Sequence, residues 1–472
     1  MNIPGGTSNS APPWDLKFAG MNYKETLDYF YAQLPMFDRI GAAAYKKGLN
    51  NTQALCAHLG NPQTRFQSIH VAGTNGKGSV SHILAAVCQA AGLKTGLYVS
   101  PHYKDLRERI KINGEYIPRG RVVDFVEANL GIIESVRPSF FEMCVAMAFD
   151  HFAREKVDIA IIETGLGGRV DSTNIITPLL SVITNISFDH TKFLGDTLPL
   201  IAMEKSGIIK PGVPVVIGES HPESAPVFRQ KAAEMSAPIY FADQNYQLTD
   251  QTNTFLSAQT RYQVYKQGQL LWENLEVDAS GPFQALNVAT ALQAVEVFEK
   301  IAGAPRIRDP ESSIRYGLSH LRTLTRFQGR WQIIGEQPTI LCDSAHNEAG
   351  IRTAFERISD LRSFNKPAAG VLATDLSKER SPDLHIVAGF VTDKDVDKML
   401  DYFPPEARYY FAKANIPRGM DTKALRERAA AAGLHGKAYS SVKNALKAAK
   451  RAADPDDLIL VIGSIFVVAE VL

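Results

Sequence analysis

The sequence predicts an α/β protein made of two domains, each built around a mostly parallel β-sheet. With 472 residues, the chain is longer than one hydrophobic core usually organises. From residue 66 onward, apolar runs that favour strands alternate with helical patterns, which is typical of βαβ units. A second series of the same kind starts after Arg330, so the alternation predicts two sheets in succession.

The first series supplies five expected strands and six expected helices. The strands are 68–72, 95–99, 157–162, 180–184 and 213–217, and the helices are 80–91, 121–135, 140–154, 198–208, 223–235 and 284–301. Within 111–117, the pair Asn113-Gly114 predicts a hairpin with a type I′ turn. The segment 245–278 has short alternating strands rich in Gln and Thr, which predicts an antiparallel patch on an edge of the sheet.

The second series lies in the last third of the chain. Its expected strands are 339–342, 385–390, 409–411 and 458–462, and its expected helices are 349–361, 394–402, 421–432 and 441–452. The segment 323–330 lacks clear periodicity, and the first twenty residues are rich in Gly, Ser, Pro and Asn without the apolar core of a signal peptide. We therefore predict a flexible leader (1–20), an N-terminal domain (21–322), a linker (323–330) and a C-terminal domain (331–472).

Composition excludes several classes of protein. A net charge of +1 argues against nucleic acid or an anionic membrane surface as the main partner. Polar residues interrupt every apolar run before it reaches membrane-spanning length. The four cysteines lie far apart in apolar surroundings, which indicates reduced, buried thiols and a cytoplasmic location. We expect a monomer that binds small molecules, and neither nucleic acid nor a membrane.

The segment from His70 to Ser79 is the most informative part of the chain. An apolar strand leads into a loop with three glycines, and a helix follows, which is the arrangement that wraps backbone N–H groups around a polyphosphate. Lys77 would neutralise the outer phosphates, and Ser79 offers an oxygen to phosphate or Mg²⁺. The spacing differs from the common Walker loop, because Gly78 separates Lys77 from Ser79. An ordinary glycine-rich turn is the alternative, which the run Asn75-Gly76-Lys77-Gly78-Ser79 directly after a buried strand disfavours.

Three polar positions follow expected strands at their carboxyl ends, where open α/β sheets bind ligands. Ser100 follows 95–99, Glu163 ends 157–162, and Asp189-His190 follows 180–184. A hydroxyl, a carboxylate and an imidazole from neighbouring strands could share Mg²⁺ or Mn²⁺ with phosphates. The alternative for each residue alone is a local hydrogen bond or cap, which for His190 is the more common case.

Four further positions carry little weight by themselves. Lys205 lies on a helix among apolar residues, where a surface lysine is the more common case. Asn287 stands at a helix start and could equally be a cap. Arg330, in Gly329-Arg330-Trp331, and Asp343, in the run Asp343-Ser344-Ala345-His346-Asn347, stand at the expected linker and at a strand end.

Taken together, the segments resemble the folate branch of the ATP-dependent Mur ligase superfamily, which contains the bacterial bifunctional dihydrofolate synthases/folylpolyglutamate synthases. The resemblance runs from about Met21 to Leu472. Nine motifs carry it, in the family's order: 73–79, 100–102, 108–117, 139–142, 163–174, 189–190, 204–210, 329–330 and 343–347. It implies an N-terminal P-loop domain of the Mur ligase central-domain type and a smaller, Rossmann-like C-terminal domain.

The resemblance also implies roles for individual residues. By it, Asn75, Gly76, Lys77, Gly78 and Ser79 hold the triphosphate of ATP. Further ATP-binding positions are Asn287, Arg330, Asp343 and His346. The implied metal ligands, for two Mg²⁺ sites, are Ser100, Glu163, His190 and Lys205, with Lys205 matching a lysine that is carbamylated in the superfamily. The segments that match the pterin or folate site are Ser139, Phe140, Phe141, Glu142, Val170, Asp171 and Ser172. The catalytic set is Lys77, Lys205 and His190.

The implied reaction joins L-glutamate to dihydropteroate, to the γ-carboxylate of a folate, or to both, through an acyl phosphate formed from ATP. One alternative is a UDP-muramyl amino-acid ligase of cell-wall synthesis. It would need a uridine-binding domain before the phosphate loop, and only about fifty residues separate Met21 from Gly73. The other alternative is a nucleotide-dependent switch without catalysis, which would not need the second metal site that Lys205 implies.

Overall fold

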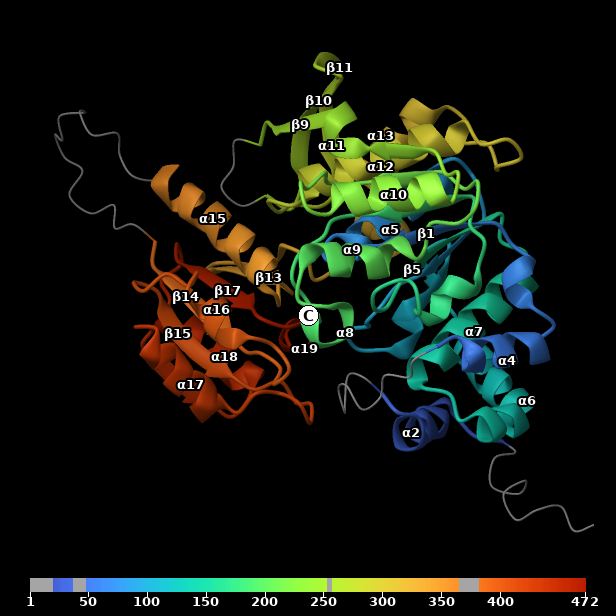
Figure 1. Cartoon of the computed structure of the whole chain (residues 1–472). Helices are drawn as coiled ribbons and strands as arrows, with labels where there is room; N and C mark the ends of the chain where they lie inside the picture. The colour runs from blue at the N-terminus through green and yellow to red at the C-terminus, as the bar shows by residue number, and fades with distance from the viewer. Residues whose placement is uncertain (1–19, 37–47, 253–256, 365–381) are drawn as a thin grey trace, which may run out of the picture.

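The computed structural model describes residues 20–36, 48–252, 257–364 and 382–472, so nearly all of the expected leader lies outside the described residues. Within these ranges the chain forms two α/β units, which lie side by side in Figure 1. None of the helices in the described ranges combines the length and the apolarity that crossing a bilayer requires. The four cysteines are buried and form no disulfide within the described ranges, as expected from their surroundings.

The N-terminal unit is built on an eight-stranded sheet in the order β4-β3-β2-β5-β1-β6-β7-β8. Pairing is parallel from β2 to β8 and antiparallel only at the β3 and β4 edge. The strands are β1 (Ser68–Ala72), β2 (Thr95–Tyr98), β3 (Ile110–Ile112), β4 (Glu115–Tyr116), β5 (Ile159–Glu163), β6 (Leu180–Ile183), β7 (Val215–Ile217) and β8 (Ile239–Phe241). The expected mostly parallel sheet is confirmed.

Helices cover both faces of this sheet, because successive strand residues point to opposite sides. Ile161 of β5 belongs to the core under α5 (Lys77–Ala90), α12 (Gln284–Glu299) and α13 (Pro310–Ser319). Its neighbour Ile162 belongs to the core on the other side. That second face carries α2 (Tyr23–Gln33), α4 (Asn50–His58), α6 (Arg119–Val136) and α7 (Phe140–Arg154), and α9 (Leu198–Ser206) and α10 (Ala225–Glu234) further along. The short helices α8 (Thr191–Leu194) and α11 (Ala242–Asn245) complete this unit.

Two sequence expectations about antiparallel structure had different outcomes. The type I′ hairpin is confirmed, since Asn113 and Gly114 have φ values of 48° and 77° between β3 and β4. The expected antiparallel patch on the sheet edge is wrong in its placement. The strands β9 (Tyr246–Asp250), β10 (Thr260–Lys266) and β11 (Gln269–Val277) form a separate sheet. Their apolar residues pack onto the core of α12 and α13 instead of joining the main sheet, whose edge is occupied by β8.

The C-terminal unit has a six-stranded sheet in the order β12-β13-β17-β14-β15-β16, parallel except for β12. Its strands are β12 (Gln332–Glu336), β13 (Thr339–Asp343), β14 (Leu384–Ala388), β15 (Arg408–Ala412), β16 (Gly436–Tyr439) and β17 (Leu458–Ile462). The helices α15 (Glu348–Phe364), α16 (Val396–Leu400) and α17 (Thr422–Ala431) cover one face, and α18 (Val442–Ala452) and α19 (Ile465–Ala469) cover the other. The short edge strands β12 and β16 were not expected from the sequence.

The connection between the two sheets runs through the expected linker, 323–330. Its first three residues complete the helix α14 (Leu321–Thr325), which is too short to show periodicity in the sequence. Arg326 follows in a left-handed conformation, donates to the Gly114 carbonyl at 2.8 Å and pairs with Glu115. The connection is therefore tied to the β3–β4 hairpin before it enters the C-terminal unit.

Candidate active site

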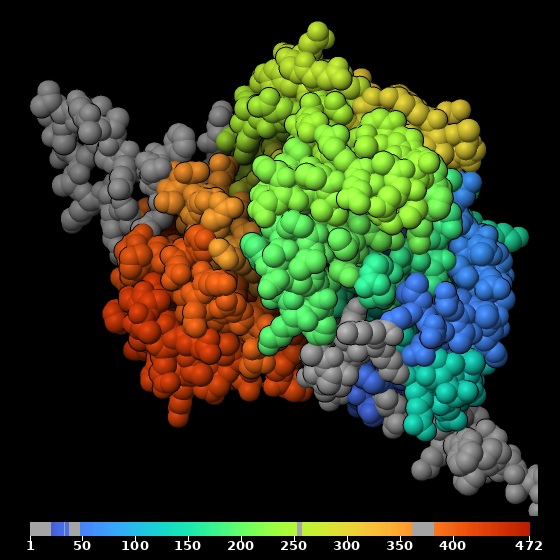
Figure 2. Space-filling model, in the orientation of Figure 1, coloured from blue at the N-terminus to red at the C-terminus, as the bar shows by residue number. Residues whose placement is uncertain are grey.

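A cleft lies between the two units, at the carboxyl ends of the parallel strands. Figure 2 shows the orange-red C-terminal unit directly against the green segment that contains α8 and α9. The cleft is lined by the loops after β1, β2, β5 and β6 and, from the other side, by residues that follow β13. Open α/β sheets bind their ligands at this end, so the position agrees with the general rule.

The loop between β1 and α5 has a backbone that only glycine adopts without strain at two points. Gly73 has a φ of +145°, and a Cβ there would lie 1.9 Å from the Thr184 hydroxyl. Gly76 has a φ of +85°, and a Cβ there would lie 2.3 Å from the side-chain oxygen of Asn287. The loop thus lies directly against β6 and α12, and it ends at Lys77, where α5 begins. This is the strand, loop and helix arrangement that the sequence predicted.

Replacing Gly73 with alanine is expected to weaken binding of an ATP analogue at least tenfold, because the new methyl group displaces the loop. Calorimetric titration with a nonhydrolysable analogue measures the effect. Gly92→Ala is the matched control, since Gly92 also has a positive φ (+85°) but has open space where a Cβ would stand. Equal affinities for Gly73→Ala and Gly92→Ala would contradict the placement of the nucleotide on this loop.

Two lysine amines meet at one backbone carbonyl of this loop. The Nζ atoms of Lys77 and Lys205 lie 2.9 Å and 2.7 Å from the Gly73 oxygen, and Lys77 also donates to the Thr74 carbonyl at 3.0 Å. Lys205 is only 4% exposed, so the reading of this residue as a surface lysine is wrong. Burial, and then the charge of Lys77, lower the pKa of Lys205 well below its ordinary value. Burial also lowers the pKa of Lys77, an effect that Glu163 opposes.

The other three expected metal ligands, Ser100, Glu163 and His190, line the same cleft as Lys205. Glu163 is buried, and one of its carboxylate oxygens accepts a hydrogen bond from the Ser100 backbone N–H at 2.9 Å. Its other oxygen lies 3.8 Å from the point where a Cβ of Gly78 would stand, so the carboxylate borders the phosphate loop. Loss of solvent lowers the pKa of His190 to about 3, which keeps the imidazole neutral at neutral pH.

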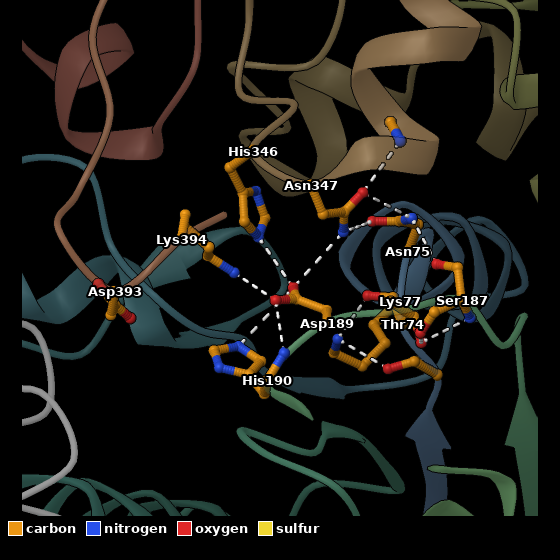
Figure 3. Close-up of polar contacts among 12 residues, drawn as sticks. Thr74, Asn75, Lys77, Ser187, Asp189, His190, His346, Asn347, Asp393 and Lys394 are labelled. Atoms are coloured by element: carbon orange, nitrogen blue, oxygen red, sulfur yellow. Dashed lines mark hydrogen bonds and ion pairs between the residues drawn. The ribbon is translucent and has the colours of Figure 1, made fainter. Parts of the chain in front are cut away.

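Asp189 joins the two units at the edge of the cleft. In Figure 3 its carboxylate lies at the centre, and Lys394, His346 and Asn347 of the C-terminal unit point toward it. Lys394 forms an ion pair with it, His346 Nε2 lies at 3.5 Å, and the Asn347 amide nitrogen at 3.4 Å. Burial raises the pKa of Asp189, but the charge of Lys394 and the hydrogen bond with His346 together hold it well below its ordinary value. A lysine of one unit therefore forms an ion pair with a buried carboxylate of the other.

Asn347 also binds the phosphate loop itself. Its amide nitrogen donates to the Asn75 side-chain oxygen at 2.9 Å, and the Asn75 nitrogen returns a bond at 3.3 Å (Figure 3). Sequence reasoning did not single out Lys394 for the site, because no local pattern marks it as a binding residue. It included Asn347 only as the last residue of the 343–347 motif and gave its side chain no role. Their positions follow from the way in which the two units meet.

The remaining expected nucleotide-binding residues also reach the cleft. Asn287 is buried in the first turns of α12, beside Gly76. Asp343 ends β13 and accepts hydrogen bonds from the backbone N–H groups of Trp331 and Ala345, at 2.8 and 2.7 Å. Asp343 thereby fixes the backbone next to Arg330, which reaches the cleft from the connection between the units.

A second, largely apolar cavity opens beside the cleft. It contains the residues expected at the pterin site, which are Ser139, Phe140, Phe141, Glu142, Val170, Asp171 and Ser172. Several of them have structural roles: Ser139 and Glu142 form a capping box at the start of α7. Asp171 accepts from the backbone N–H groups of Gly165 and Leu166, at 2.8 and 2.7 Å, and so shapes the loop after β5.

The two cavities share a boundary. Ser100, His190 and Arg330 line both of them, together with His346. The larger cleft offers cations, backbone N–H groups and a buried carboxylate, which suit a polyphosphate with a divalent cation. The second cavity offers aromatic and aliphatic walls, which suit a flat aromatic ligand. The arrangement can bring a phosphate chain to one end of an aromatic compound.

Comparison with known proteins agrees with this geometry. Residues 71–295 match the model of the Mur ligase middle domain, and residues 329–465 match that of the Mur ligase glutamate ligase domain. The protein is therefore an ATP-dependent ligase of the Mur ligase family.

The individual relatives indicate a narrower family than the two domain models do. The chain is 32% identical over 459 residues to the folylpolyglutamate synthase of Lacticaseibacillus casei, covering 96% of this chain and 98% of that protein. It is 31% identical to the dihydrofolate synthase/folylpolyglutamate synthase of Escherichia coli, covering 90% of each. It also spans half of a probable bifunctional folylpolyglutamate synthase/dihydropteroate synthase of Haloferax volcanii, at 31% identity over 95% of this chain. The chain belongs to the dihydrofolate synthase and folylpolyglutamate synthase family.

Solved structures extend the likeness to the whole fold. E. coli FolC in complex with DHPP and ADP has a TM-score of 0.77 at 28% identity, covering 96% of this chain and 97% of that one. A complex of a folylpolyglutamate synthase with AMPPCP and folate has a TM-score of 0.76 at 30% identity, covering 96% and 98%.

Proposed function

We propose that this protein uses ATP to join L-glutamate to the carboxylate of dihydropteroate, to the γ-carboxylate of a folate, or to both in turn. The observation that carries the proposal is the shared boundary of the phosphate-binding cleft and the aromatic cavity, at Ser100, His190 and Arg330. A carboxylate held at that boundary would face the terminal phosphate of ATP. Family membership at about 30% identity over nearly the whole chain supports the same reaction class.

The reaction would proceed through an acyl phosphate. A carboxylate oxygen attacks the γ-phosphorus of ATP, ADP leaves, and the carbonyl carbon gains a good leaving group. The amine of glutamate then attacks that carbon, and phosphate departs as the amide forms. Lys77 and Arg330 would stabilise the charge that builds up during phosphoryl transfer, which depends mainly on positioning and electrostatics.

The residues at the cleft fit Mg²⁺, which prefers oxygen ligands and tolerates imidazole less readily than zinc does. Glu163 supplies a buried carboxylate beside the phosphate loop, Ser100 a hydroxyl, and His190 a neutral imidazole. A bound divalent cation would neutralise phosphate charge. Lys205 is the proposed carbamylated position for a second ion. Burial lowers the pKa of its amine and so favours loss of the proton, and the neutral amine is the form that combines with CO₂.

The second cavity is the proposed site of the pterin or folate. Phe140 and Phe141 would stack on the flat ring system. Gly165 allows the loop after β5 to approach the Phe141 ring closely, since a Cβ at this position would lie 2.4 Å from that ring. Closure of the two units, tied by Asp189 and Asn347, would exclude water that hydrolyses the acyl phosphate. We propose residues 21–322 and 331–472 as the two units that close.

The test is turnover by the purified full chain with ATP, Mg²⁺ and L-glutamate. Parallel reactions contain dihydropteroate, tetrahydrofolate, a UDP-muramyl substrate or no acceptor, and ADP release and product mass are measured. We expect ADP release that requires both glutamate and a pterin-type acceptor, with one glutamyl residue added per ADP. Turnover only with the UDP-muramyl substrate would identify a cell-wall ligase instead. Nucleotide binding without glutamate-dependent ADP release would identify a switch.

A further inference from the structure

The Tyr103 hydroxyl links the N-terminal unit to the connection between the two sheets. Tyr103 lies in the loop after β2, three residues beyond Ser100, and its ring packs against the core of the C-terminal unit. The hydroxyl accepts a hydrogen bond from Nη1 of Arg330 at 3.0 Å and donates one to the Gln328 carbonyl at 3.2 Å. The Tyr103 hydroxyl thus contacts both the guanidinium group of Arg330 and the backbone two residues before Arg330.

Both ends of this contact are held in place. The buried Glu108 carboxylate accepts from the backbone N–H groups of Tyr103, Lys104 and Asp105, at 2.6, 2.9 and 2.9 Å. On the other side, Gly329 has a φ of +71°, and a Cβ there would lie 2.0 Å from the Tyr103 hydroxyl. The Gly329 carbonyl accepts from the Ser344 hydroxyl at 3.0 Å, which ties this turn to the C-terminal unit. Tyr103 therefore fits against a backbone shape that only glycine takes easily.

The guanidinium that Tyr103 holds borders both cavities. Arg330 lines both the phosphate cleft and the aromatic cavity, and Lys77 and Glu163 line the cleft with it. A guanidinium on a flexible stem contributes to phosphoryl transfer only when it is oriented, since a misplacement of about 1 Å can cost a large factor in rate. The hydrogen bond that Nη1 of Arg330 donates to the Tyr103 hydroxyl fixes that orientation before the nucleotide binds.

We propose that Tyr103 is a positioning residue that orients Arg330 toward the terminal phosphate of ATP. The inference rests on the proposed function, because it assigns a partner to a residue of that site. Tyr103 itself does not need to touch the nucleotide. Its effect on turnover passes through Arg330.

The conservative variant Tyr103→Phe tests this, because it removes only the hydroxyl. A hydrogen bond to a charged group has the strength to change a rate or affinity ten- to a hundredfold, and we expect about a tenfold loss in kcat/KM for ATP. Affinity for a nonhydrolysable ATP analogue should fall by roughly the same factor, while KM for the pterin acceptor stays within about twofold. Tyr116→Phe is the matched control, since Tyr116 lies on β4 and its ring packs under Arg326 instead of Arg330.

A double-mutant cycle separates positioning from a general structural role. In the background of Arg330→Ala, adding Tyr103→Phe should change kcat/KM by less than about twofold, because the two residues act as a unit. Independent, multiplicative losses in the cycle would overturn the proposal, and so would unchanged kinetics and affinity in Tyr103→Phe. If the wild-type protein shows no glutamate-dependent ADP release, the proposed function fails, and the analogue titrations with the same four proteins still decide the role of Tyr103.

Discussion

Replacing Lys77 with alanine is expected to lower glutamate-dependent ADP release by about 10³-fold, which corresponds to about 4 kcal/mol of transition-state stabilisation. Lys77 opens helix α5, and its Nζ donates to the Gly73 and Thr74 carbonyls. A short rotation of this side chain would carry the amine from those oxygens to the outer phosphates. Alanine leaves the loop backbone in place but removes the cation.

The loss should come from the chemical step and not from unfolding. The thermal unfolding temperature of Lys77→Ala should match the wild-type value or exceed it, because the change removes an amine whose charged form burial disfavours. Lys192→Ala is the matched control, since Lys192 lies on the exposed side of the nearby helix α8. ADP release by folded Lys77→Ala at more than a tenth of the wild-type rate would show that the loop has no role in phosphoryl transfer.

Replacing Lys205 with alanine is expected to lower amide synthesis at least 100-fold, because the change removes the proposed anionic ligand of a second cation. Lys205 is buried and lies beside Lys77 on the Gly73 carbonyl, so a cationic lysine there would repel its neighbour. Conversion of the amine to a carbamate replaces this repulsion with attraction. The measurement is the rate of product formation at saturating ATP and acceptor.

Two further experiments distinguish a carbamate from a plain cation at this position. Lys205→Arg keeps the charge and about the same length but cannot be carbamylated, so it should be as inactive as the alanine variant. Added acetate or formate should restore part of the activity of Lys205→Ala by occupying the vacated space, and should leave Lys205→Arg inactive. Activity of Lys205→Arg close to wild type would contradict the carbamate and leave a role for positive charge alone.

Much of the site could be predicted from the sequence because its residues follow parallel strands. Ser100, Glu163 and Asp189-His190 come from β2, β5 and β6, which lie on the two sides of β1 in the sheet. The carboxyl ends of parallel strands meet at one edge, so residues that are distant in the chain become neighbours. The phosphate loop was predictable for the same reason, since a buried strand, glycines and a helix start define it locally.

Other features depend on tertiary contacts and left no local pattern. The amine of the buried Lys205 donates to the Gly73 carbonyl, 132 positions earlier in the chain. Its own helix does not indicate which side is buried, because apolar residues occur on all sides, including the exposed Met203. Lys394 and Tyr103 enter the site only because the two units meet there. The strand β16 is short and only half-buried, so its residues lack the apolar run that predicts a core strand.

The loop after β5 serves both cavities with adjacent residues. Glu163, the last residue of β5, borders the β1–α5 loop at Gly78, and Gly165, two positions later, borders the aromatic wall at Phe141. A shift of the peptide here moves both walls together, so selectivity for the acceptor and reactivity toward ATP are mechanically coupled. Variants designed to accept bulkier carboxylic acids in the aromatic cavity should therefore change Phe141 on α7 and leave the loop after β5 intact.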